Sequence, residues 1–63
     1  DVAQSLGNMA VVYHSSRDYD RAENFYRASL DIFRRFRPSD DPEVEAVQAN
    51  YDSLLERRAA EKA

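Results

Sequence analysis

The stretch DYDRAENFYRASLDIFRRFR, residues 18–37, decides the fold of this chain. Its apolar and small residues recur every three or four positions, which is the spacing of one face of an α-helix of about five turns. The face comprises Ala22, Phe25, Tyr26, Ser29, Phe33 and Phe36. Ala22 and Ser29 are small residues one heptad apart, with bulky aromatic side chains around them. A helix with such notches predicts close packing against a neighbouring helix.

A first helix is predicted for residues 1–16. Asp1 is the expected N-cap, with Gln4 three residues on as in a capping box. Its predicted packing face repeats at i, i+4, i+7 and i+11 and comprises Val2, Leu6, Met9 and Tyr13, with Ala3 and Ala10 beside them. Gly7 costs about 0.8–1.0 kcal/mol relative to Ala inside a helix. Either another group approaches Gly7 closely or the helix tolerates the cost, and we expect tolerance.

Two breaks in the periodicity separate three helices. Residues 15–17 predict a short turn, so that the first two helices form an antiparallel hairpin. Asp41 followed by Pro42 predicts a cap and a first helical residue, and the third helix is expected from residue 42 to about residue 60. Its apolar positions are Val44, Val47, Tyr51, Leu54 and Leu55. Nothing is expected to pack against its last two turns. Residues 1–37 are therefore assigned to the hairpin, and residues 38–63 to a linker and a third helix.

Composition limits the class of protein. A chain of 63 residues forms one domain at most, and one Gly and two Pro leave little turn chemistry for a β-sandwich, so we predict an all-α fold. The net charge of −3 argues against a nucleic-acid partner. There is no cysteine, and no apolar run approaches the ~18 residues of a membrane span. The chain lacks an initiator Met, so we expect a fragment of a longer protein, with the cytoplasm as the default compartment.

No residue pattern predicts an enzyme, a metal site or a cofactor. His14 is the single histidine and is expected at the surface. Ser15, Ser16 and Ser29 have no base partner other than His14, and the chain is too small for a catalytic pocket. Helix capping accounts for Asp40, Asp41 and Glu43 better than a cation site does. A solvated helix end accounts for Arg34, Arg35 and Arg37 better than an anionic partner does.

A partial internal repeat is also present. A shift of 42 residues places Asp1-Val2 on Glu43-Val44 and Asn8 on Asn50. This period is typical of one and a half units of a helical solenoid.

The chain resembles the tetratricopeptide repeat family in its 42-residue form, as found in kinesin light chains. The matching positions are Leu6, Met9, Ala10 and Tyr13 in the first helix, Tyr19, Ala22, Tyr26, Ser29 and Leu30 in the second, and residues 39–44 in the linker. The alignment runs without a gap from Val2 to Val44. Arg17 departs from the family's turn glycine, so a left-handed residue there would be strained. The resemblance implies a C-terminal repeat followed by a capping helix.

The resemblance also implies a function. In the family, the first helix of each repeat lines a concave groove that holds a protein or peptide partner. Carried onto this chain, that groove face comprises Gln4, Asn8, Val11, His14 and Ser15. The alternative is self-association, as a homodimer or by exchange of the third helix. The reason is that a monomer would leave four apolar residues partly exposed to solvent: Leu6, Met9, Val12 and Phe33. Under these expectations, Phe33→Glu should weaken self-association and leave peptide capture intact.

Overall fold

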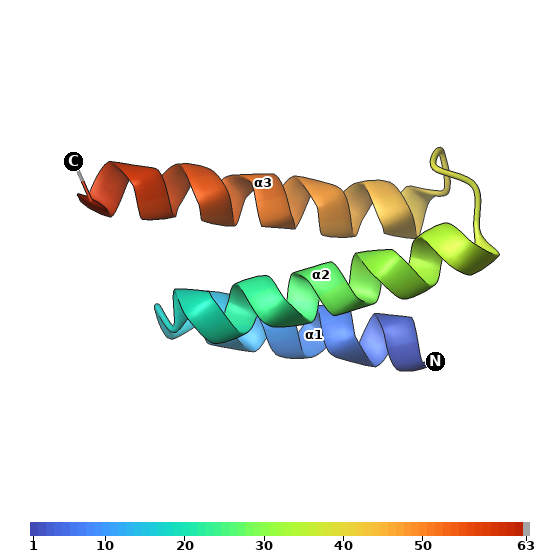
Figure 1. Cartoon of the computed structure of the whole chain (residues 1–63), viewed down its shortest axis with the longest axis horizontal. Helices are drawn as coiled ribbons and strands as arrows, with labels where there is room; N and C mark the ends of the chain where they lie inside the picture. The colour runs from blue at the N-terminus through green and yellow to red at the C-terminus, as the bar shows by residue number, and fades with distance from the viewer. Residues whose placement is uncertain (63) are drawn as a thin grey trace.

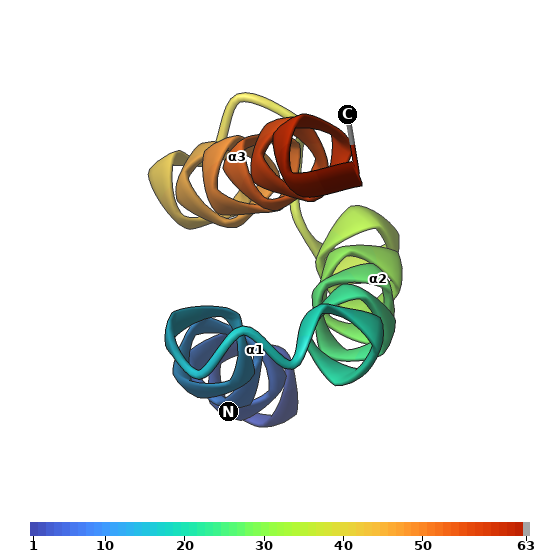
Figure 2. The same ribbon diagram turned by 90° about the vertical axis from the view of Figure 1, so that its left-hand side faces the viewer.

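The computed structural model describes residues 1–62 and shows three helices, which confirms the all-α prediction. They are α1 (Val2–Ser15), α2 (Tyr19–Phe36) and α3 (Pro42–Lys62). α1 and α2 run antiparallel, and α3 runs back along α2 in the direction of α1 (Figure 1). Seen end-on, α2 stands between the other two helices, and the three outline an open C (Figure 2).

The predicted starts of α1 and α3 are confirmed at the level of hydrogen bonds. The Asp1 carboxylate accepts from the backbone N–H of Gln4 at 2.8 Å, and that of Asp41 accepts from the N–H of Glu43 at 2.9 Å. Each bond satisfies one of the backbone donors that a helix start leaves unpaired. Asp18 is the N-cap residue of α2, but its side chain makes no capping bond and pairs instead with Arg21 at 3.5 Å.

The turn between α1 and α2 contains a left-handed residue at Arg17, where the family resemblance implies strain. Arg17 has a φ of 63°, in the left-handed region that glycine adopts most easily. The N–H of Asp18 bonds to the carbonyl of Tyr13 at 2.9 Å, and the N–H of Arg17 to that of His14 at 3.1 Å. These two bonds form a Schellman cap, in which an arginine occupies the position that usually holds glycine.

α1 packs on α2 mainly through its smallest residues. The packing face predicted for α1 is therefore right at Ala3, Ala10 and Tyr13 but wrong at Val2 and Met9. Ala3, Gly7 and Ala10 are buried, whereas Val2 and Met9 are 66% and 42% exposed. A Cβ on Gly7 would lie 3.3 Å from the Ser29 hydroxyl, so close approach explains this glycine, and the expectation of mere tolerance is also wrong. On α2, the predicted notches Ala22 and Ser29 are both fully buried.

The third helix covers the other side of α2 with larger side chains. Val44 is buried in a cluster with Ala3, Leu30 and Phe33. Leu54 is buried in a second cluster with Ala10, Ala22 and Tyr26. Val47 and Tyr51 are partly buried against both clusters and so join them into one core.

Two residues predicted in apolar stripes lie outside this core. Phe36 is 80% exposed, because it stands at the last residue of α2, and Leu55 is also exposed. The last two turns of α3, expected to contact nothing, are held by polar contacts. Arg58 pairs with Glu23 at 2.8 Å and also with Asp20, and Glu61 accepts a hydrogen bond from Tyr19.

Candidate interaction surfaces

A groove of about 180 Å³ runs between α1 and α3. α1 contributes Gln4, Gly7, Asn8 and Val11, α3 contributes Glu43, Ala46, Val47 and Asn50, and Phe33 of α2 forms part of the lining. The groove therefore brings together three of the five residues predicted for the groove face: Gln4, Asn8 and Val11. They share one side of α1 because they are spaced four and three residues apart.

The groove combines apolar side chains with amides and is nearly uncharged. Among the described residues that line it, Glu43 alone carries a charge, and its carboxylate pairs with Arg37 at 3.4 Å. Asn8 and Asn50, which occupy equivalent positions of the 42-residue repeat, contribute amides from the two opposite walls. An amide offers two donors and an acceptor, which suits a peptide backbone.

His14 and Ser15 do not join the groove. His14 is half-buried, which corrects the expectation of a surface histidine. Its Nδ1 lies 3.1 Å from the Tyr26 hydroxyl, and its ring packs edge-on against Tyr19 and Tyr26. His14 therefore faces α2 and helps to hold the hairpin. Ser15 is exposed but does not line the groove.

A second surface lies on the solvent side of α1. We call it the outer face and define it by Val2, Ser5, Met9 and Val12, all of which are exposed. Val12 is 56% exposed, and Leu6, beside the outer face, is half-buried. From Val2 to Ser15, α1 contains no Asp, Glu, Lys or Arg. Such an uncharged exposed helix face is typical of a surface that another helix covers.

Phe33 is almost fully buried, so the expectation that it is partly exposed in a single copy, and with it its predicted role in self-association, is wrong. It is 2% exposed and packs with Ala3, Leu30 and Val44, at the place where all three helices meet. Its position three residues before the end of α2 lets α3 cover it, whereas Phe36 lies beyond that cover. Leu6, Met9 and Val12 remain as the predicted residues that face solvent in whole or in part.

The arginines at the C-terminal end of α2 contact polar side chains of this chain. Arg34 donates to Gln48 at 3.1 Å, Arg35 pairs with Asp31 at 3.4 Å, and Arg37 pairs with Asp1 at 3.2 Å. The arginines at the end of α2 are therefore engaged within the chain. Among residues 1–62, no group of three His, Cys, Asp or Glu side chains could hold a metal ion.

Two tyrosines have altered acidity. The hydrogen bond to Glu61, aided by partial burial, raises the pKa of Tyr19 above its ordinary value of 10.0. Burial raises the pKa of Tyr26 in the same direction. Both shifts arise because a phenolate would stand beside a carboxylate or inside the core, where charge is unfavourable.

Comparison of the chain with family models, with curated proteins and with solved structures found no match. Within residues 1–62, none of the helices combines the length and the apolar character needed to cross a membrane.

Proposed function

We propose that this chain is a non-enzymatic protein-interaction module that holds a peptide segment in the groove between α1 and α3. The observation that carries the proposal is the composition of that groove. Residues from two helices of a 42-residue repeat line one concave surface, and Asn8 and Asn50 supply amides from its opposite walls.

The resemblance to the tetratricopeptide repeat family supports the same proposal. In this interpretation α1 and α2 are the last repeat, and α3 is the capping helix that completes its groove. Since α1 and α3 both rest on α2, the groove walls are preorganised, and a peptide would bind without the cost of ordering them. The near absence of charge favours a partner segment recognised through its backbone and through small apolar side chains.

A selection from random peptides of about 12 residues, displayed on phage, supplies a ligand for a direct test. Asn8→Ala and Asn50→Ala should each weaken binding of a selected peptide by about 2- to 12-fold, since each removes about one net hydrogen bond. The exposed Asn24, which lines neither surface, provides the control Asn24→Ala. Equal binding by all four proteins, or a selected peptide whose contacts map by NMR outside the groove, would refute the proposal.

Self-association is a second candidate, and a separate observation favours it. The outer face leaves Val2, Met9 and Val12 exposed on a helix without charged residues. Because the groove residues lie on another side of α1, the two functions do not compete for the same side chains.

A further inference from the structure

The outer face has the pattern of a helix-packing seam. Its residues are spaced by three, four and three positions, as the a and d positions of a coiled coil are. The 42-residue repeat identifies the same positions in α3 as Val44, Val47, Tyr51 and Leu54. These are the residues with which α3 packs on the core. α1 therefore leaves exposed the very face that α3 buries.

A second copy's α2 cannot cover this face in the way α2 covers α3. The side of α2 that receives α3 is already occupied, and it carries Glu23 and Arg27. The hydroxyl of Tyr51 accepts from Arg27 and donates to Glu23, each at 3.1 Å. The residue of α1 equivalent to Tyr51 is Met9, which can do neither. Stacking on this side of α2 is therefore blocked by α3. Replacement of α3 by α1 would remove both Tyr51 hydrogen bonds and leave Glu23 and Arg27 with only their mutual contact at 3.5 Å.

We propose instead that two copies of this chain pair through their outer faces, with the two α1 helices antiparallel about a twofold axis. In that register Val2 of one copy lies opposite Val12 of the other, and Ser5 lies opposite Met9. The pattern is self-complementary, because each large Met9 meets a small Ser5 and the layers can interdigitate. This proposal deepens the self-association candidate and does not depend on peptide binding in the groove.

Electrostatics favour the same arrangement. A twofold interface brings identical surfaces together, so a charged face would oppose like charges. The outer face has none to oppose. Antiparallel pairing also places the positive N-terminal end of each α1 beside the negative C-terminal end of the other.

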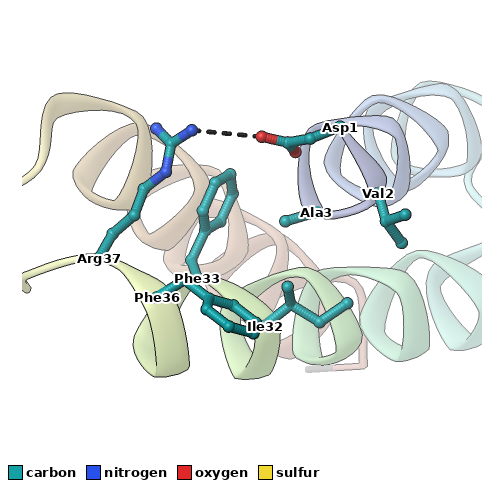
Figure 3. Close-up of a pocket in the computed structure, with 7 residues that line it drawn as sticks. All are labelled: Asp1, Val2, Ala3, Ile32, Phe33, Phe36 and Arg37. Carbon is teal, nitrogen blue, oxygen red and sulfur yellow. Dashed lines mark hydrogen bonds and ion pairs between the residues drawn. The ribbon is translucent and has the colours of Figure 1, made fainter.

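The apolar surface continues past the end of the outer face. A pocket of about 330 Å³ is lined mainly by Val2, Ala3, Ile32, Phe33 and Phe36. The Asp1–Arg37 ion pair, 3.2 Å long, bridges α1 and α2 across its rim (Figure 3). The proposed register brings Val12 of the second copy to Val2, and so to the edge of this pocket. Phe36 would then lie near the interface and lose part of its exposure.

Sedimentation equilibrium of the 63-residue chain tests the association itself. A short helix pair is a small interface, so we expect a change from the 7.3 kDa monomer to a dimer at concentrations on the order of tens of micromolar. Met9→Glu should raise the dissociation constant at least about tenfold, because it places two carboxylates near the twofold axis. Asn24→Glu adds the same charge at an exposed site of α2 and should leave the dissociation constant unchanged.

Mixed pairing tests the register. Val2→Glu and Val12→Lys should each weaken the homodimer, and an equimolar mixture should form a heterodimer preferentially. In it the new Glu of one copy faces the new Lys of the other, while the second Val2–Val12 layer stays apolar. Both variants should keep the helical circular dichroism of the wild type, since Val2 and Val12 are mostly exposed.

Three outcomes would overturn the proposal. A wild-type chain that stays monomeric up to about 200 µM would leave the outer face to a preceding helical repeat, as the array interpretation implies, or to a helix of another protein. A dimer that Met9→Glu does not weaken would use a different surface. Homodimers weakened without preferential mixed pairing would exclude the antiparallel register. None of these results bears on the groove, which Asn8→Ala tests separately.

Discussion

The two interfaces of α2, with α1 and with α3, are formed by different kinds of side chain. Towards α1 it presents Ala22 and Ser29, and the hydroxyl of Ser29 donates to the carbonyl of Ala3 at 2.7 Å in a fully buried setting. Towards α3 it presents larger apolar residues edged by charges, with Arg58 and Tyr51 both bonded to Glu23. The first interface depends on small side chains along most of its length and on aromatic contacts near the turn, such as Tyr13 on Phe25. The second depends on paired polar groups. Mutations should therefore affect the first through size and the second through charge.

The largest effect is expected where the two interfaces meet. Phe33→Glu would place a carboxylate in the cluster that joins all three helices, at a cost of about 4 kcal/mol or more. The free energy of unfolding of a domain is only roughly 0.05–0.15 kcal/mol per residue, so this variant should lose most or all of its stability. Phe36→Glu, in the exposed last turn of the same helix, should change the free energy of unfolding by about 0.5 kcal/mol or less. Circular dichroism with urea denaturation measures both.

Ala10→Leu probes the small-residue interface. Ala10 is fully buried in the cluster with Ala22, Tyr26 and Leu54, and overpacking there should lower the free energy of unfolding by about 1–3 kcal/mol. Ala28→Leu makes the same change at an exposed site of α2 and should have little effect. Similar urea midpoints for the two variants would contradict close packing between these helices.

Glu23→Gln probes the charged interface. It keeps the shape of the side chain but removes the charge that Arg58 and Arg27 contact, at 2.8 and 3.5 Å. We expect a loss of about 1–2 kcal/mol. Hydrogen exchange should speed up in α3 and stay nearly unchanged in the Ala10 region of α1. If hydrogen exchange became equally faster in α3 and in the Ala10 region of α1, the two interfaces would not be independent.

Arg17→Gly should stabilise the chain by about 0.5–1 kcal/mol, because glycine adopts the observed φ of 63° without strain. The lost ion pair with Glu61, 3.6 Å long and exposed, offsets little of this gain. Arg17→Ala removes the same ion pair but keeps a Cβ in the left-handed conformation. If the alanine variant were as stable as the glycine variant, strain at residue 17 would not be the cause.

The smallest effect concerns alkaline pH. Because the folded state raises the pKa values of Tyr19 and Tyr26, their contribution to stability is complete below the ordinary value of 10.0. It is lost as the pH rises above that value, since the unfolded chain then releases protons that the folded chain retains. Urea midpoints measured across this range should fall less steeply for Tyr26→Phe than for the wild type. A midpoint that is flat above pH 10 would contradict the shifts.

The same contrast explains what the sequence could predict. Ala22 and Ser29 stand out as small residues on an otherwise bulky stripe, so the α2 face of the hairpin was predictable. On α1 the rule that large apolar residues face the core fails, because Ser29 lies close to Gly7 and only small residues fit there. Gly7 was the one signal of that close approach.

The candidate surfaces were predictable to a different extent. The family resemblance implies a groove face that includes Gln4, Asn8 and Val11, and these three residues line the groove between α1 and α3. The sequence could not show that His14 turns towards Tyr26, because that orientation depends on how α2 is placed. The sequence also could not predict the ion pair between Arg58 and Glu23, because these residues are 35 positions apart and only the folded arrangement brings them together.

The absence of Lys and Arg from α1 also has a practical consequence. The first site at which trypsin could cut this chain is Arg17, so digestion releases the whole of α1 as one peptide, residues 1–17. That peptide contains the outer face and the α1 wall of the groove. Covalent footprinting with mass spectrometry would therefore report protection of either surface as a change in a single fragment, and fragmentation within it would tell Met9 from Asn8.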